Sequence, residues 1–139
     1  YTRERRGRYT EMTANEIYRK GREILRDAGV ENSGFDAMEI FKLCFGVSRE
    51  YLILNRVKCL PEKEILRYFE CINERSCGRP LQYILGEWSF MGLSFKVGEG
   101  VLVPRDDTEV LVRKAESILR GQESAKVLDL CAGSGAVAW

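Results

Sequence analysis

A glycine-rich segment near residue 130 has the residue types of a cofactor-binding turn. It reads Asp129-Leu-Cys-Ala-Gly-Ser-Gly135, and it overlaps an apolar stretch, Ala125 to Leu130, that we predict to be a buried strand. Small residues let backbone N–H groups, and the N-terminus of a helix predicted to begin near Gly135, come close to a ligand. Asp129 would end the buried strand, so its carboxylate needs a hydrogen-bond donor or a ligand.

Three interpretations fit this segment taken alone. It could bind S-adenosylmethionine, a nucleotide-like cofactor with no phosphate at the turn. It could bind a dinucleotide, because Gly133 to Ala138 satisfies G-x-G-x-x-G/A, or it could be a structural turn without a ligand. Asp129 favours the first, since a carboxylate repels a pyrophosphate but tolerates a sulfonium cofactor that carries an amino group. No G-x-x-x-x-G-K-[ST] occurs, which excludes a P-loop.

Composition excludes several other kinds of chemistry. The 139 residues include no histidine, so no imidazole base and no Ser-His or Cys-His scheme is available. The five cysteines form no C-x-x-C pair, and we expect reduced thiols, no metal site and a cytoplasmic location. A net charge of +1 gives no argument for nucleic acid as a direct partner. No apolar run approaches the roughly 20 residues that span a membrane, so we expect no membrane partner.

Apolar residues at helical spacing predict a bundle of four to five short helices within residues 12–86. Thr13 and Glu16 have the spacing of a capping box for the first helix, and Gly29 ends it. A second helix is predicted from Gly34 or Phe35 to Phe45, and Gly46 is predicted to end it. The remaining signals are Ser48 as the cap of a short third helix with Tyr51, Leu52 and Leu54, Pro61 at the start of a fourth, and Pro80 before a short helical stretch that ends at Leu85. The preceding residues, 1–11, carry four arginines, and we expect a basic, flexible terminus rather than a nucleic-acid arm.

Residues 87–139 differ in pattern from the helical region. We predict a β-hairpin over Glu87 to Val97 with its turn at Met91-Gly92, and then a short extended segment, Val101 to Val103. Asp106 or Asp107 is predicted to cap a helix that Gly121 ends. Together with the strand and the glycine turn, this is the start of a Rossmann-like α/β domain in a chain that is otherwise mainly α. Because one βα unit cannot bury both faces of a parallel strand, we expect these residues to be part of a longer protein.

Four ordered blocks resemble the HemK/PrmC family, the protein-(glutamine-N5) methyltransferases that modify peptide chain release factors. They are Gly78-Arg-Pro-Leu-Gln-Tyr-Ile-Leu-Gly86, Ser89-Phe-Met-Gly-Leu-Ser-Phe-Lys-Val97, Val101-Leu-Val-Pro-Arg-Asp-Asp-Thr-Glu109 and Val127-Leu-Asp-Leu-Cys-Ala-Gly-Ser-Gly-Ala136. The resemblance implies a class I methyltransferase domain behind a helical substrate-docking domain. It further implies S-adenosylmethionine as cofactor and a release factor as protein partner, docked in part on the helical domain.

The resemblance also implies roles for individual residues. The methionine end of the cofactor would contact Asp129, Cys131, Ala132, Gly133, Ser134 and Gly135. Arg105 could face the cofactor carboxylate, or it could simply form a surface ion pair with an acidic residue of 106–109. Leu102 and Pro104 would lie on the substrate side, with Leu102 beside the acceptor side chain.

The sequence departs from the family pattern in a few places. Cys131 stands where glycine is usual, Ala132 where a small polar residue is usual, and Asp106 where proline is common. The family's acidic ribose-binding residue and its Asn-Pro-Pro-Tyr acceptor motif do not occur in these residues, so we assign no catalytic residue here. We expect the 139 residues alone to bind cofactor weakly or not at all and to be inactive. Two alternatives remain open, a non-catalytic protein-binding helical module and an NAD-binding Rossmann oxidoreductase.

Overall fold

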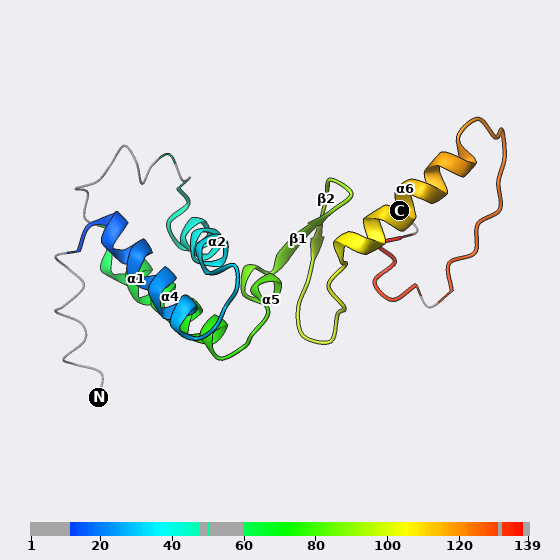
Figure 1. The fold of residues 1–139 in the computed structure, drawn as a ribbon. Helices are drawn as coiled ribbons and strands as arrows, with labels where there is room; N and C mark the ends of the chain where they lie inside the picture. The colour runs from blue at the N-terminus through cyan, green and yellow to red at the C-terminus, as the bar shows by residue number, and fades with distance from the viewer. Residues whose placement is uncertain (1–11, 48–49, 51–59, 131, 138–139) are drawn as a thin grey trace. The chain divides into compact units, whose positions relative to one another are not determined.

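The computed structural model describes residues 12–47, 50, 60–130 and 132–137. It divides the chain into two compact units, Tyr1–Leu85 and Gly86–Trp139. The elements, labelled in Figure 1, are α1 (Ala14–Asp27), α2 (Ser33–Phe45), α4 (Glu62–Ser76), α5 (Leu81–Leu85), β1 (Glu87–Phe90), β2 (Leu93–Lys96) and α6 (Asp106–Leu119). The helix predicted from Ser48 lies outside the described residues, as does the basic terminus, residues 1–11.

Helix α1 begins and ends where its local signals predict. The backbone N–H of Glu16 donates to the Thr13 hydroxyl at 3.3 Å, and the Glu16 carboxylate accepts from the Thr13 backbone N–H at 2.7 Å. This is the predicted capping box. Gly29 follows the helix with φ +81°, a left-handed conformation that glycine adopts without steric cost.

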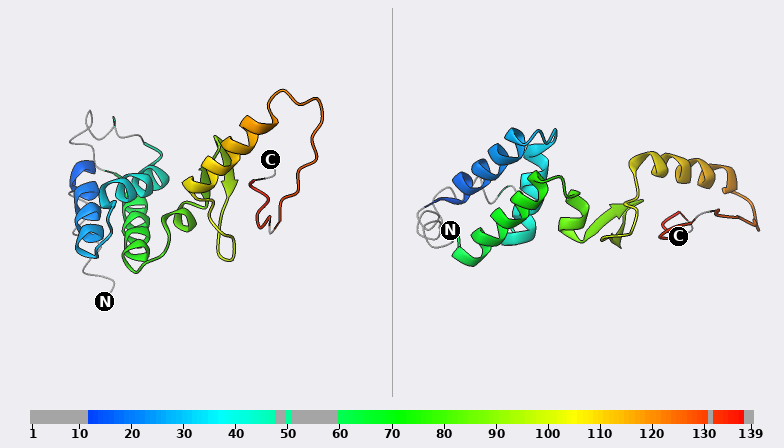
Figure 2. Two further views of the ribbon diagram at one scale, coloured as in Figure 1. Left: turned by 45° about the vertical axis from the view of Figure 1, so that its right-hand side comes forward. Right: turned by 90° about the horizontal axis from the view of Figure 1, so that it is seen from below.

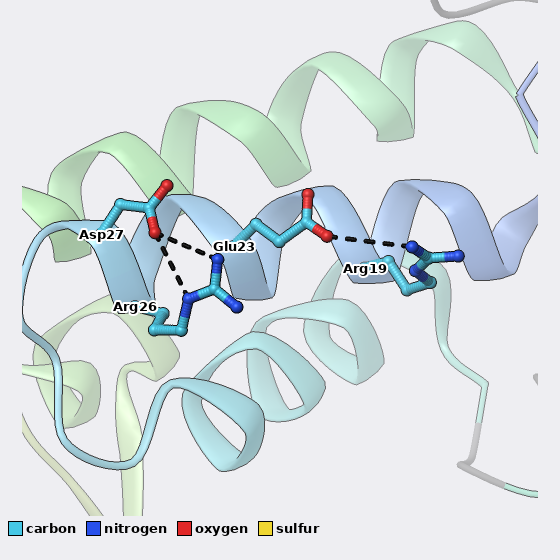
Figure 3. Close-up of polar contacts among 4 residues, drawn as sticks. All are labelled: Arg19, Glu23, Arg26 and Asp27. Carbon is cyan, nitrogen blue, oxygen red and sulfur yellow. Dashed lines mark hydrogen bonds and ion pairs between the residues drawn. The ribbon is translucent and has the colours of Figure 1, made fainter.

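The exposed face of α1 carries two ion pairs (Figure 3). Arg19 lies 3.9 Å from Glu23, and Arg26 lies 3.2 Å from Asp27. All four side chains are largely exposed to water, where screening and side-chain entropy reduce the value of an ion pair to about 0–1 kcal/mol. The stability of α1 therefore comes from its buried face.

Helices α1, α2 and α4 pack against one another in the first unit (Figures 1 and 2), and their apolar side chains form its core. Its largest fully buried side chains are Tyr68, Phe41, Ile17, Leu25, Ile40, Ile65 and Ile72. The rings of Phe41 and Tyr68 meet edge to face with centroids 5.5 Å apart. Gly21 allows close packing of α1 on α4, because a Cβ at this position would clash with the Tyr68 hydroxyl oxygen.

One buried ion pair also joins α2 to α4. Asp36 is 5% exposed, and its carboxylate accepts a hydrogen bond of 2.7 Å from Nε of Arg75. Nη1 of Arg75 donates to the Arg79 carbonyl beyond the end of α4 at 3.2 Å. The guanidinium thus satisfies a buried charge and fixes the segment that leads into α5.

Strands β1 and β2 form the predicted antiparallel hairpin. Trp88 pairs with Phe95 and Phe90 with Leu93, which leaves Met91 and Gly92 as a two-residue turn. Both turn residues have positive φ, +52° and +80°. Positive φ at both central positions is the type I′ arrangement, whose twist matches that of the strands.

Helix α6 forms where the sequence predicts a helix, but its cap differs. Arg105 occupies the N-cap position without a side-chain cap, whereas Asp106 and Asp107 lie inside the first turn. The prediction that Asp106 or Asp107 caps this helix is therefore wrong by one or two residues. Carboxylates in the first turn still interact favourably with the partial positive charge of the helix N-terminus. No residue of α6 is buried.

The predicted strand from Ala125 to Leu130 does not form. Val127, Leu128 and Leu130 are 72%, 80% and 76% exposed, and residues 124–129 have irregular backbone. The segment from Val101 to Val103 is also irregular, and turns replace the helix expected from Gly135. A parallel strand needs neighbours for its backbone hydrogen bonds, and the described residues contain no strand that pairs with this segment. The fold described is mainly helical with one small sheet, and the Rossmann-like start is not formed.

Candidate functional site

The glycine segment forms a tight turn with an accessible backbone. The Gly135 N–H donates to the Ala132 carbonyl at 2.9 Å, and Gly133 and Gly135 have φ of +58° and +76°. Ala132, Gly133 and Ser134 are exposed, and a Cβ on Gly135 would meet nothing within 4 Å. This backbone is open to a ligand, as the small residues predict. Cys131 lies outside the described residues.

Asp129 presents the main polar group of this segment. Its Oδ2 is buried and has no hydrogen-bond partner among the described residues. A buried carboxylate oxygen without a donor is unfavourable, so the position suits a ligand that brings one. The amino group at the methionine end of S-adenosylmethionine is such a donor, and the residues present fit that cofactor in kind.

The second predicted group, residues 102–105, is open to solvent. Leu102 is 76% exposed, Arg105 is exposed and Pro104 is half-buried. In the part of the chain that the structure describes, no hydrogen bond or ion pair joins residues 102–105 to the turn at 132–135. The structure thus places the two groups in the same unit without assembling them into a closed site.

Glu109 has a positioning role that its place in the sequence block did not reveal. Its carboxylate accepts a hydrogen bond of 2.7 Å from the backbone N–H of Met91 and one of 3.2 Å from Arg113. The Met91 hydrogen bond, followed by the Arg113 guanidinium, lowers the pKa of Glu109 below its ordinary value. Glu109 therefore pairs with Arg113 and not with Arg105, and it connects the hairpin turn to the first turn of α6.

A sequence signal for this contact exists in retrospect. The turn Met91-Gly92 has only two residues, and the N–H of its first residue does not take part in the strand pairing. Such a group needs an acceptor. Which of the nearby carboxylates supplies it depends on how α6 packs, and local spacing does not give that information.

The described residues give little support to other kinds of site. No group of three or more Cys, Asp or Glu side chains within them could hold a metal ion. None of the helices they form has both the length and the apolar character needed to cross a membrane. Cys44, Cys71 and Cys77 are free thiols, and they are buried, half-buried and exposed, respectively.

Comparison with known proteins supplies the family. Residues 16–86 match the model described as PrmC N-terminal domain. A release factor glutamine methyltransferase of Fusobacterium nucleatum subsp. nucleatum is 40% identical over 123 residues, which cover 88% of this chain and 35% of the relative. Proteins of the same name from Clostridium botulinum and Clostridium acetobutylicum are 31% and 36% identical over 91% and 85% of the chain, and 44% and 41% of those relatives.

These matches reach past the helical unit into residues 87–139, because each covers more than four-fifths of the chain. The chain spans less than half the length of the curated relatives it matches. The family model alone covers half of the chain. The chain therefore belongs to the HemK/PrmC family, and residues 16–86 are its PrmC N-terminal domain.

Proposed function

We propose that the protein carrying this chain is an S-adenosylmethionine-dependent methyltransferase that methylates the N5 atom of a glutamine side chain in a peptide chain release factor. The observation that carries this proposal is the similarity to release factor glutamine methyltransferases along both units of the chain. A cytoplasmic location follows as part of the same proposal, because release factors act on cytoplasmic ribosomes and free thiols suit a reducing compartment.

In this proposal the helical unit docks part of the release factor. Its core is closed within residues 12–85, with side chains such as Ile17, Phe41 and Tyr68 fully buried. A unit with its own core can present a rigid surface to a protein partner, which lowers the entropy cost of binding. The non-catalytic binding module considered from the sequence is thereby one part of an enzyme.

The glycine segment would hold the methionine end of the cofactor. Asp129 would accept a hydrogen bond from the amino group of the cofactor. The exposed residues Ala132, Gly133 and Ser134, with the half-buried Gly135 and with Cys131, would contact the methionine end of the cofactor. Arg105 would face the cofactor carboxylate, while Leu102 and Pro104 would lie beside the acceptor. The bound cofactor supplies an activated methyl group on a positive sulfonium. Alignment and charge are then the main tasks of the protein, and a chain without histidine can perform them.

We also propose that the 139 residues alone bind the cofactor weakly and transfer no methyl group. The turn at residues 132–135 is preceded by irregular, exposed backbone, so no paired strand holds Asp129 in place. A ligand would have to order this segment on binding, and the loss of conformational entropy opposes that.

The experiment is a methylation assay with the complete protein, a release factor and S-adenosylmethionine. We expect mass spectrometry to find one added methyl group on a single glutamine. Asp129→Asn should raise the KM for the cofactor, whereas the exposed control Glu123→Gln should not change it. A titration with S-adenosylhomocysteine and NAD tests the dinucleotide alternative. Binding of NAD in preference to S-adenosylhomocysteine would overturn the proposal, as would methylation of a residue other than glutamine.

A further inference from the structure

Two cysteine residues meet where α2 packs against α4. Phe41 and Phe45 of α2 contact Tyr68 of α4, with ring centroids 5.5 Å and 5.9 Å apart. Cys44 follows Phe41 by three residues and Cys71 follows Tyr68 by three, so each thiol lies about one helical turn beyond this ring contact. The side chains of Cys44 and Cys71 interact with each other across this helix contact. The packing of α2 on α4 thus brings two thiols from different helices close together.

The two thiols differ in access to solvent. Cys44 is 7% exposed and belongs to the core, whereas Cys71 is half-buried and so partly open to water. Neither is engaged in a disulfide. The Cys71 sulfur can therefore react with a small oxidant from solvent, while the Cys44 sulfur stays buried in the core.

The surroundings also make the two thiols chemically unequal. Interaction with the Cys44 thiol lowers the pKa of Cys71, although burial and the carboxylates of Glu74 and Glu70 oppose the shift. Arg67 on the same helix favours the thiolate. The same interaction, together with burial, raises the pKa of Cys44. The thiolate is the reactive form, so the more accessible sulfur is also the more nucleophilic one.

We propose that Cys44 and Cys71 form an oxidation-sensitive thiol pair that closes to a disulfide between α2 and α4 on reaction with a peroxide. The Cys71 thiolate attacks one peroxide oxygen, the O–O bond breaks, and hydroxide leaves, which gives a sulfenic acid at Cys71. The Cys44 sulfur then attacks the Cys71 sulfur, the S–O bond breaks, and hydroxide leaves again. Hydroxide takes up the proton of Cys44, so that two thiols and one hydrogen peroxide yield one disulfide and two waters.

This inference is independent of methyl transfer. It concerns the helical unit, whose core lies apart in sequence from the glycine segment. A covalent bond between α2 and α4 would restrict the unfolding of that unit and raise its Tm, since a cross-link reduces the conformational freedom of the unfolded chain. Reduction by a dithiol would reverse the change.

Trypsin places the five cysteines in five different peptides, so mass spectrometry can identify which two cysteines are linked. Cleavage after Lys42, Arg49, Arg67 and Arg75 places Cys44 in residues 43–49 and Cys71 in residues 68–75. Cys59, Cys77 and Cys131 fall in three further peptides. The protein is treated with hydrogen peroxide, its remaining thiols are alkylated, and the digest is analysed by mass spectrometry. We expect a linked peptide pair 43–49/68–75 that lacks two hydrogen atoms and disappears on reduction.

Substitutions test the order of the steps. Cys71→Ser should abolish the linked pair, and Cys44→Ser, which keeps a hydroxyl donor beside Cys71, should leave a sulfenic acid on Cys71 that dimedone traps. The matched control is Cys77→Ser, which removes an exposed thiol and should leave the link intact. Circular dichroism checks that each variant is folded, and the wild-type digest is informative even if one is not. A disulfide that joins other cysteines, or oxidation of Cys77 while Cys44 and Cys71 stay reduced, would overturn the proposal.

Discussion

The helical unit and the unit that follows it contain similar proportions of apolar side chains in regular patterns, but the first buries far more of them. Seven of the eight largest fully buried side chains belong to α1, α2 and α4, and the eighth is Phe90 of β1. In the second unit, Val110, Leu111 and Ile118 of α6 are 62–68% exposed. An amphipathic pattern can therefore form a helix in both units, while a core requires a second apolar surface that faces the first.

This contrast explains why the glycine segment is open. The residues before it, Val127 and Leu128, have the apolar character of a buried strand but are 72% and 80% exposed. The helical unit buries its apolar side chains among its own helices, whereas the glycine segment needs neighbouring strands and helices to cover it. The relatives are more than twice as long as the matched region. Their length is consistent with a domain that contains such covering strands and helices.

An isoleucine-to-alanine substitution in each unit should give the largest difference in the free energy of unfolding. Ile17 of α1 is fully buried and Ile118 of α6 is 62% exposed. Ile17→Ala should lower the free energy of unfolding of this chain by about 2–5 kcal/mol, because it removes buried methyl groups and leaves a cavity. Ile118→Ala should change it by less than about 0.5 kcal/mol. Urea denaturation followed by circular dichroism measures both, and equal losses would show that α6 has a buried face.

Loss of the buried ion pair between Asp36 and Arg75 should have the second largest effect on stability. Arg75→Leu leaves the carboxylate of Asp36 buried without its cation, and we expect a loss of about 2–3 kcal/mol, since the Arg75 side chain is itself 23% exposed. The control is Arg26→Leu, which removes the exposed pair with Asp27 in Figure 3 and should cost about 0–1 kcal/mol. Similar losses for the two variants would contradict a special role for the buried pair.

Substitution of Gly21 tests the close packing of α1 on α4, and substitution of Gly34 in α2 is its control. Gly21→Ala would place a methyl group where it clashes with the Tyr68 hydroxyl, and we expect the resulting strain to lower the free energy of unfolding by about 1–3 kcal/mol. At Gly34 in α2 the nearest atom would be 3.6 Å away, on the Arg22 side chain. Gly34→Ala should therefore stabilise the protein by about 0.5–1 kcal/mol through lower entropy of the unfolded chain. In thermal unfolding, the Tm should fall for Gly21→Ala and rise for Gly34→Ala.

Weakening the capping box of α1 should have the smallest effect on stability, and this effect should depend on pH. The hydrogen bond from the Thr13 backbone N–H lowers the pKa of Glu16 below its ordinary value of 4.5. The unfolded chain therefore binds the proton more readily, so the stabilisation is present above pH 4.5 and is lost as the pH falls through the folded value. Glu16→Gln keeps the capping geometry but removes the charge. The difference in Tm between the two proteins should shrink in acid, and a difference that is independent of pH would refute this origin.

The features predicted correctly from the sequence are those with local causes. Thr13 and Glu16 satisfy the first backbone groups of α1 within three residues, and Gly46 ends α2 with φ +63°. The Met91-Gly92 turn likewise depends on four neighbouring residues. Such signals operate without regard to the rest of the fold.

The features that were wrong or missed have distant causes. The strand at 125–130 was predicted from its apolar residues, but a strand forms only with partners, and none is described. The pairs Asp36–Arg75 and Met91–Glu109 join residues 39 and 18 positions apart, which spacing rules do not connect. For the candidate site, the sequence identified the small residues and Asp129, while their assembly depends on contacts that no local pattern encodes.

Hydrogen exchange on the 139-residue chain, with and without S-adenosylhomocysteine, tests the contrast between the two units most directly. We predict slow exchange of the backbone amides in α1, α2 and α4, where the core is closed. The amides of residues 125–137 should exchange rapidly, and the ligand should not slow them. Strong protection of residues 125–137, either before or after the ligand is added, would contradict this contrast and show that the 139 residues alone order the glycine segment.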